Sequence, residues 1–231
     1  MKTCAIIGVG PGNGEACARR FAADGYAVAL LSRTQETLDR LAAQLPNARA
    51  LVCDAADPIA VQKSLADIAA TLGPIDVLIY NAGAGVFGSI EDVDFAALET
   101  AWRINVLGLA AAAKTVGPVM AAGGGGTIFV TGATASVRGS ARFAAFTQAK
   151  AGQRALAQSI ARHWGPKGIH VAYMIVDGVI DLERTRAMMP DKGDDDFLKA
   201  ADIAETVHHI CHQPRSAWTF EYDLRPFAEA W

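Results

Sequence analysis

The chain alternates between two hydrophobic patterns along its length. Short continuous apolar runs, bounded by Gly, Pro, Asn or Asp, have the length and composition of strands buried on both faces of a parallel sheet. Between them lie stretches rich in Ala and Leu, whose apolar positions recur with the spacing of an amphipathic helix. Because strands that alternate with helices form βαβ units, the pattern predicts one doubly wound α/β domain with three layers, α/β/α.

Seven strands and six helices are predicted, enough for a single seven-stranded parallel sheet. The strands are Cys4–Val9, Ala27–Ser32, Ala48–Cys53, Val77–Asn81, Thr127–Thr131, His170–Val176 and Phe220–Leu224. The helices are Gly14–Asp24, Gln35–Gln44, Pro58–Leu72, Phe95–Ala122, Gln148–Gly165 and Asp202–Gln213. Residues 181–199 follow neither pattern, and we expect them to form a substrate-loop excursion over one end of the sheet, within a single domain of residues 1–231.

A glycine-rich turn follows the first strand, with the sequence Gly8-Val9-Gly10-Pro11-Gly12-Asn13-Gly14, and an Ala-rich helix comes next. In this context glycines let the backbone approach a pyrophosphate at the helix N-terminus. The spacing of Gly8, Gly12 and Gly14 differs from G-x-G-x-x-G. The turn therefore predicts a dinucleotide site, with ordinary turn chemistry as the alternative.

The end of the second strand distinguishes the two nicotinamide dinucleotides. An acidic residue there binds the ribose 2′-hydroxyl of NAD(H), whereas an arginine accommodates the 2′-phosphate of NADP(H). Here Ser32, Arg33 and Thr34 occupy the position, and they offer a guanidinium fork and two hydroxyls to a phosphate. NADP(H) is therefore favoured, and NAD(H) stays open. In the alternative, Arg33 lies on a helix surface and pairs with Glu36 or Asp39.

Composition narrows the class of protein. The chain has 231 residues with 52% hydrophobic and 19% charged residues, as expected for a well-buried globular domain. The net charge of −3 and the scattered basic residues argue against a nucleic-acid partner. The chain contains no run of 18 apolar residues, so we expect no membrane span, and the pattern at its start leads us to expect no secretory signal. The four widely spaced cysteines lack a C-x-x-C motif, so we expect reduced thiols and a cytoplasmic protein.

Several further motif residues follow the predicted strands and helices in a defined order along the chain. Asp54 follows the third strand, Asn81-Ala82-Gly83 the fourth and Gly178 the sixth, while Asn105 lies in the long helix and Lys150 near the start of the next. Together with the glycine spacing, this order resembles the short-chain dehydrogenase/reductase family over nearly the whole chain. The resemblance implies a Rossmann-type sheet with strand order 3-2-1-4-5-6-7.

The resemblance also implies how a cofactor is held. It puts Asp54 near the adenine, Asn81-Ala82-Gly83 along the cofactor and Lys150 on the nicotinamide ribose. The predicted cofactor-binding residues are Gly8, Gly12, Asn13, Gly14, Ser32, Arg33, Asp54, Ala55, Asn81, Ala82, Gly83, Lys150, Gly178 and Val179. Members of the family are usually dimers or tetramers, which implies self-association through the helices 95–122 and 148–165 and the last strand.

At the positions of the family's catalytic tyrosine and serine, this sequence has other residues. The tyrosine of Y-x-x-x-K falls on Phe146 in Phe146-Thr147-Gln148-Ala149-Lys150, and the family serine falls on Ala133. Ile7 replaces the leading Thr of the glycine motif, and Asp177 replaces the Pro before Gly178. These changes indicate a divergent subgroup with Phe in place of the catalytic Tyr.

Other groups must supply the proton if the chain is an enzyme, because losing a positioned general acid costs about 10²–10⁴ in rate. Lys150 is a candidate as a cationic acid or oxyanion stabiliser. The hydroxyls of Thr134 and Ser136 are candidate hydrogen-bond donors, and Asp177 is a candidate acid, with a turn role as the alternative. The predicted catalytic residues are Lys150, Asn105, Thr134, Ser136 and Asp177.

The altered acid position also suits hydride transfer to an activated double bond. Ala133, Phe143 and Phe146 would line such a substrate pocket, and core packing is the alternative for the two phenylalanines. We therefore expect an NADP(H)-preferring oxidoreductase that acts on a small or medium carbonyl or activated alkene without the family Tyr. A cofactor-binding but non-catalytic protein, either a redox sensor or a partner subunit, is the alternative.

Two clusters contain residue types that bind metals. His208 and His212 share one helix face, as in zinc sites, but the sequence offers no third ligand. Histidines in the last turn of a helix also interact favourably with its dipole. Residues 194–196 are three aspartates that more simply begin a helix. We therefore predict no metal site.

Overall fold

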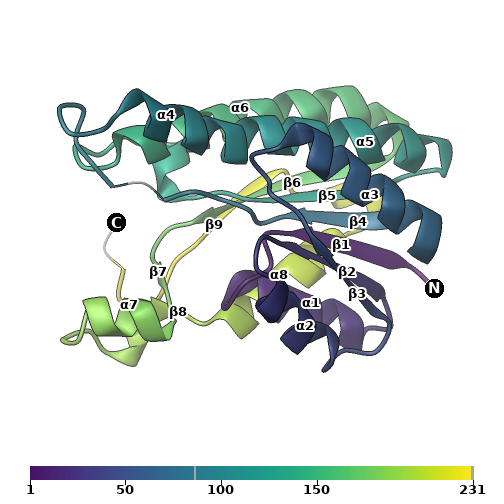
Figure 1. The fold of residues 1–231 in the computed structure, drawn as a ribbon, viewed down its shortest axis with the longest axis horizontal. Coiled ribbons are helices and arrows are strands. Elements are labelled where there is room, and N and C mark those ends of the chain that lie inside the picture. The colour runs from purple at the N-terminus through teal and green to yellow at the C-terminus, as the bar shows by residue number, and fades with distance from the viewer. Residues whose placement is uncertain (86, 230–231) are drawn as a thin grey trace.

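A seven-stranded parallel sheet forms the centre of the protein, with strand order β3-β2-β1-β4-β5-β6-β9 (Figure 1). The computed structural model describes residues 1–85 and 87–229. The strands are β1 (Thr3–Ile7), β2 (Ala27–Ser32), β3 (Ala48–Val52), β4 (Ile75–Tyr80), β5 (Gly126–Thr131), β6 (Ile169–Val176) and β9 (Glu221–Leu224). This order is the predicted 3-2-1-4-5-6-7 arrangement, so the Rossmann-type fold is confirmed.

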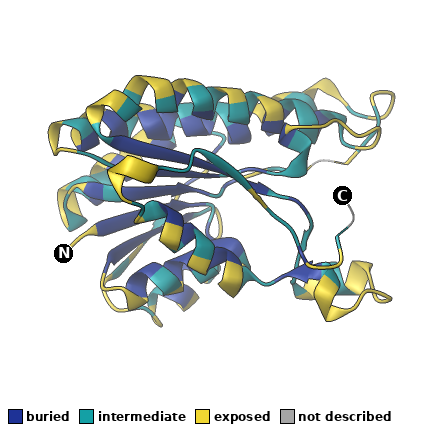
Figure 2. Cartoon of the chain, turned by 180° about the vertical axis from the view of Figure 1, so that it is seen from behind, coloured by how far each residue is buried: buried dark blue, intermediate teal, exposed yellow. Residues whose placement is uncertain are grey.

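Helices cover both faces of the sheet. They are α1 (Asn13–Ala23), α2 (Gln35–Ala42), α3 (Pro58–Leu72), α4 (Phe95–Trp102), α5 (Gly108–Ala122), α6 (Ala144–Trp164), α7 (Glu183–Met188) and α8 (Ala200–Cys211). Figure 1 shows α3, α4, α5 and α6 on one face and α1, α2 and α8 on the other. Each face has its own hydrophobic cluster, and the five inner strands between them are mostly buried, whereas the edge strands β3 and β9 are only partly buried (Figure 2). Strands covered on both sides become continuous apolar runs, which is why the sequence revealed them.

The predicted helix 95–122 is continuous but changes its winding in the middle. Between α4 and α5 lies a π-helical turn, η1 (Arg103–Leu107), which carries Asn105. Such turns occur often at functional sites, and hydrophobic periodicity does not detect a single one. The stretch is long and apolar enough to cross a membrane by length and composition, but half of its most apolar window is buried. Its buried side includes Leu109 and Val116, which pack in the core on the sheet.

Helix α6 begins at Ala144, one turn before the predicted start at Gln148. The residue before it, Phe143, provides no side-chain cap, so the usual polar signal for a helix start is absent. The early start places Phe146 in the first turn and puts Lys150 well inside the helix. The prediction of the helix start was therefore wrong by four residues.

Residues 181–199 contain more regular structure than the sequence predicts. Strands β7 (Val179–Ile180) and β8 (Phe197–Leu198) pair as a separate two-stranded parallel sheet, and α7 lies between them. The three aspartates form a single 3₁₀ turn, Asp194–Asp196, that leads into β8. Strands of two residues are too short to give a periodic pattern. The segment lies beyond the carboxyl ends of the main strands (Figure 1).

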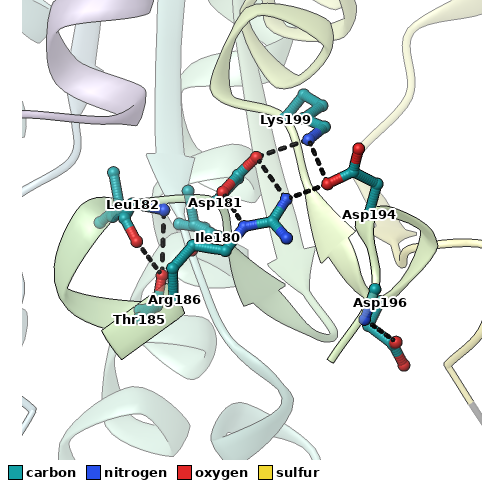
Figure 3. Close-up of polar contacts among 9 residues, drawn as sticks. Ile180, Asp181, Leu182, Thr185, Arg186, Asp194, Asp196 and Lys199 are labelled. Carbon is teal, nitrogen blue, oxygen red and sulfur yellow. Dashed lines mark hydrogen bonds and ion pairs between the residues drawn. The ribbon is translucent and has the colours of Figure 1, made fainter. Parts of the chain in front are cut away.

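An ionic network centred on Asp181 ties this segment together (Figure 3). The Asp181 carboxylate accepts hydrogen bonds from Arg186 Nε at 2.6 Å and Lys199 Nζ at 2.5 Å. Arg186 also pairs with Asp194 at 2.6 Å, and its guanidinium lies 4.1 Å from the centre of the Phe197 ring. Arg186 and then Lys199 hold the pKa of Asp181 well below its usual range. One carboxylate thus connects the last turn of α7 to the residue after β8.

We expect Asp181→Asn to loosen residues 182–198 while the main sheet stays folded. The neutral amide no longer compensates the two cations, so local opening becomes easier. Hydrogen-exchange mass spectrometry at pH 7 should show faster exchange in this segment and unchanged protection in β1 and β4. Asp191→Asn is the matched control, because Asp191 is exposed in the same segment and has no polar partner among the described residues. Equal exchange in the two variants would contradict the role of Asp181.

The pH dependence of the same network has a definite sign. A carboxyl whose folded pKa is lowered contributes stability above its unfolded pKa, about 3.9 for Asp, and loses it as the pH falls towards the folded value. In the wild-type protein, residues 182–198 should therefore keep their protection from neutral pH down to about pH 4. Loosening of this segment between pH 7 and 5 would contradict the ion-pair account.

Candidate active site

The glycine turn is shaped by close backbone contacts. Gly8 has φ 94°, and a Cβ there would lie 2.4 Å from the Ala82 backbone nitrogen. A Cβ on Gly14 would lie 2.7 Å from the Gly8 carbonyl oxygen, to which the Asn81 side-chain amide donates at 2.9 Å. The turn after β1 and the turn after β4 are therefore packed against each other, and only glycine fits at these two positions.

Next to this contact, a cleft of ≈ 190 Å³ opens at the carboxyl ends of the strands. Its lining residues are Ile7, Gly8, Val9, Ser32, Arg33, Cys53, Asp54, Ala55, Asn81, Ala82, Gly83 and Ile104. The cleft lies where the strand order reverses between β1 and β4, which is where ligands bind in doubly wound sheets. Eight residues predicted to bind a cofactor meet in it: Gly8, Ser32, Arg33, Asp54, Ala55, Asn81, Ala82 and Gly83.

Arg33 lines this cleft with an exposed side chain. The alternative in which it pairs with Glu36 or Asp39 is wrong, because Asp39 accepts a hydrogen bond from Gln35 at 2.6 Å and Arg33 makes no ion pair within residues 1–85 and 87–229. Its guanidinium is therefore available to an anion in the cleft. Asp54, by contrast, uses one carboxylate oxygen to accept the Ala56 backbone N–H at 2.9 Å.

The other predicted cofactor residues lie around the start of α1. Helix α1 has Gly12 at its N-cap without a side-chain cap, so its first turn suits an anion. The side chain of Asn13 is buried, and its Oδ1 has no partner among the described residues. A Cβ on Gly12 would lie 3.0 Å from Leu182, so the 181–199 segment lies against the glycine turn. Gly178 lies between β6 and β7, and Val179 is the first residue of β7.

Lys150 is a buried lysine without a carboxylate partner in the described residues. Its ammonium donates to the Thr131 carbonyl at 2.8 Å and to Gln153 Oε1 at 2.9 Å. Burial lowers the pKa of Lys150 to about 7. The nitrogen lies 5.8 Å from the centre of the Phe146 ring. A group with this pKa both gives and takes protons near neutral pH.

Asn105 shares a small space with Lys150. Its side chain is fully buried in the π turn, where Nδ2 donates to the Ala101 carbonyl at 2.8 Å and Oδ1 has no partner among the described residues. A Cβ on Gly83 would lie 3.4 Å from Asn105 Oδ1 and 3.5 Å from Lys150 Nζ. The absence of a side chain at Gly83 thus leaves an acceptor and a cation facing the same space. Such a polar space accommodates a ligand oxygen or a water molecule.

The predicted substrate pocket is partly assembled. Phe146 and Ala133 are half-buried, and the Phe143 ring packs against Phe87 with centroids 5.0 Å apart. Ser136 is buried, and its hydroxyl donates to the Ala133 carbonyl at 2.7 Å. This hydrogen bond gives Ser136 a structural role and leaves its proton unavailable to a substrate.

Thr134 and Asp177 belong to a polar cluster at the mouth of the site. The Thr134 hydroxyl donates to Asp177 Oδ1 at 2.5 Å. Asp177 is buried and pairs with Arg225 at 3.0 Å and with Arg138 at 3.7 Å. Its oxygens are thus engaged by two arginines and a hydroxyl, which favours an anchoring role over the predicted acid role.

Sequence reasoning missed the residues that lie behind Lys150. Gln153 is fully buried and accepts from both the lysine and the Tyr173 hydroxyl, the latter at 3.5 Å. Gln153 follows Lys150 by three positions on α6, so helical spacing was a usable signal. Tyr173 comes from β6, and only packing brings it here, where it also donates to the Lys150 carbonyl at 3.3 Å.

One family profile and several known proteins are similar to this chain. The sequence profile of the short chain dehydrogenase family matches residues 2–192. Dehydrogenase/reductase SDR family member 4 of Homo sapiens is 28% identical over 225 residues, which cover 91% of this chain and 81% of that protein.

Two solved structures have the same fold over almost their full length. A short-chain dehydrogenase from Rhodopseudomonas palustris has a TM-score of 0.85 and 35% identity, covering 97% of this chain and 98% of its own. A blue fluorescent protein from a metagenomic library, in complex with NADPH, has a TM-score of 0.87 and 26% identity, covering 99% and 98%.

Proposed function

This chain belongs to the short-chain dehydrogenase family, and from that premise we propose that it is an NADP(H)-preferring oxidoreductase that uses Lys150 in place of the family tyrosine. The substrate is a small or medium carbonyl compound or an activated alkene. The observation that carries the cofactor preference is the exposed guanidinium of Arg33, which lines the cleft without an ion-pair partner among the described residues. A related fold bound to NADPH supports the same cofactor.

The residues of the cleft fit such a cofactor. Arg33 and Ser32 offer donors to a 2′-phosphate, and the uncapped start of α1 suits the pyrophosphate. The Oδ1 atoms of Asn13 and Asn105 are buried and have no partner among the described residues, so each can accept a hydrogen bond from a ligand. NADPH supplies the hydride when bound. The chain itself must then hold the substrate and stabilise or protonate the oxygen or carbon that receives charge.

Lys150 is the residue best placed for that task. Its ammonium lies beside Phe146 and faces the space that Gly83 leaves open. A cation in a buried site stabilises a developing oxyanion more strongly than it would in water. The pKa of about 7, which burial produces, also lets the ammonium release its proton at neutral pH. Phe146 and Ala133 add apolar surface where the family has hydroxyls.

Nucleotide binding is the first test of this proposal. The purified protein is titrated with NADPH and NADH, and the fluorescence of the nucleotide is followed. Tight NADPH binding with weaker NADH binding is expected. Loss of NADPH absorbance with a panel of small ketones, aldehydes and enones then tests turnover. Binding of neither nucleotide would refute the proposal.

A non-catalytic, cofactor-binding role is the second candidate, because both Phe146 and Ala133 are apolar where the family has its Tyr and Ser. As a redox sensor or partner subunit, the protein would bind NADPH without turnover. Helices α4 and α5 present the exposed Phe95, Trp102 and Val119, which suits the predicted self-association through the helices 95–122 and 148–165. Reproducible turnover of any substrate would remove this candidate.

Phe146→Tyr separates the two candidates. If Lys150 acts on the substrate without a tyrosine, the new phenol beside the ammonium competes with the substrate for hydrogen bonds to it and takes up space in the pocket. We therefore expect a several-fold loss of kcat. A silenced site would instead gain activity. Phe95→Tyr is the matched control, because Phe95 is exposed on α4 and does not line the cleft. Steady-state rates of NADPH oxidation measure both variants.

A further inference from the structure

A cluster of metal-ligating side chains lies at the opposite end of the sheet from the cleft. Asp24 is the C-cap residue of α1, and His208 and His212 lie at the end of α8. The two helices lie in the same layer of the fold (Figure 1). Chain order places the cluster at the amino ends of the strands, because Asp24 directly precedes β2 while Arg33 follows it. The cluster is therefore independent of the proposed cofactor site.

The donor atoms of the three side chains are close enough to share one ion. One ligand atom from each lies within 4.8 Å of the other two. His208 Nε2 is 3.0 Å and His212 Nε2 is 3.9 Å from Asp24 Oδ2. A tetrahedral zinc site, with bonds of about 2.0–2.2 Å, holds its ligand atoms about 3.3 Å apart. The His208 Nε2–H donates to the Asp24 carboxylate, so side-chain rotations together with release of this proton to solvent complete such a site.

The hydrogen bonds of His212 fix which ring nitrogen carries the lone pair. Its Nδ1 lies 2.7 Å from the His208 carbonyl oxygen, which only accepts, so Nδ1 carries the proton. In the neutral ring Nε2 then carries the lone pair, which accepts the Tyr26 hydroxyl at 2.9 Å, so an ion that binds Nε2 takes the place of this hydroxyl. A backbone carbonyl that orients a histidine in this way is typical of metal sites.

The surroundings suit a cation. The Phe21 ring packs edge-on against His208 at 5.1 Å, which limits the movement of that imidazole. The neighbouring cation, Arg20, is paired with Glu205 at 2.7 Å. Asp24 and His212 keep 44% and 33% of their side-chain surface exposed, so an ion can enter from solvent.

We propose that Asp24, His208 and His212 bind one divalent transition-metal ion, with Zn²⁺ as the best match, and that the ion clamps the end of α8 to the end of α1. Two imidazole nitrogens and one carboxylate oxygen suit zinc and its neighbours better than Ca²⁺ or Mg²⁺, which prefer oxygen ligands. The sequence pairs the two histidines on one helix face, and the fold supplies the missing third ligand from α1. The ion stabilises the folded state because the unfolded chain has no such site.

Binding is tested on the full chain without a histidine tag, after removal of metals with EDTA. Zn²⁺ is added in a calorimetric titration, and Co²⁺ is added while visible absorption is recorded. One equivalent should bind, and Co²⁺ should give the intense absorption bands of a four-coordinate site. At one hundred times the Kd, Zn²⁺ should raise Tm by about 5 °C or more.

Three variants separate this site from adventitious binding. His212→Gln and Asp24→Asn change partly exposed residues and should each weaken Zn²⁺ binding at least tenfold, with unchanged far-ultraviolet circular dichroism. His209→Gln is the matched control, because His209 is exposed on the same helix and lies outside the cluster. It should bind Zn²⁺ like the wild type. The proposal is overturned if the wild type binds no ion, or if His212→Gln binds as tightly as His209→Gln.

Discussion

Replacing Lys150 with methionine is expected to lower kcat for NADPH oxidation by about 10²–10⁴, the usual contribution of a positioned acid. Methionine keeps the volume of the side chain but removes the ammonium that faces Phe146 and Gly83. Because burial disfavours the charged form of this lysine, the protein should stay folded without it. Steady-state kinetics and thermal unfolding of the same preparation separate the two effects.

Lys114→Met is the matched control for this substitution, because Lys114 is exposed on α5. It should leave both kcat and Tm unchanged. Undiminished turnover in Lys150→Met would remove Lys150 from the proposed chemistry.

The pH dependence gives a second, independent signature of Lys150. If its ammonium donates the proton, the rate of carbonyl reduction should fall as the pH rises through about 7, the value to which burial lowers this pKa. The stability of the folded protein should change in the opposite direction and increase with pH. Between this pKa and the unfolded value of about 10.4, the unfolded chain holds a proton that the native protein has lost, so the free energy of unfolding rises with pH. Lys150→Met should abolish that rise.

Replacing Arg33 with alanine is expected to raise the Kd for NADPH about 10- to 100-fold and to leave the Kd for NADH nearly unchanged. Hydrogen bonds to a charged group contribute about 1.5–3 kcal/mol, and each 1.4 kcal/mol is a factor of ten in affinity. Only NADPH carries the 2′-phosphate that this guanidinium would meet. Fluorescence titrations of both nucleotides at fixed ionic strength measure the two constants.

Arg49→Ala is the matched control for Arg33→Ala, since Arg49 is an exposed arginine on the neighbouring strand β3 and does not line the cleft. It should bind both nucleotides like the wild type. If Arg33→Ala weakened the binding of NADPH and NADH equally, the arginine would not be a contact of the 2′-phosphate. Salt should also weaken NADPH binding more than NADH binding, because the contact is between exposed charges.

Much of the fold is readable from local patterns. The strands of a covered parallel sheet are continuous apolar runs, and β2 was predicted with the bounds that the structure has, Ala27–Ser32. Features without a local pattern were missed: β7 and β8 have two residues each, and the π turn around Asn105 interrupts the helix without changing its composition. The true start of helix α6 was missed because Phe143, the residue before it, is not one of the polar residues that signal a helix start.

The sequence by itself determined most of the strands and helices, the family resemblance and the residue types of the candidate site, because these depend on periodicity and on motifs within short segments. The strand order was predicted only as what that resemblance implies. Only the tertiary structure decided which polar groups meet. It left Arg33 without an ion pair in the cleft, among the described residues, and it engaged Asp177 with arginines. It also brought Asp24 to His208, which lies 184 residues further along the chain. Contacts of this kind depend on how α1 packs against α8, and packing between distant elements leaves no pattern in either one alone.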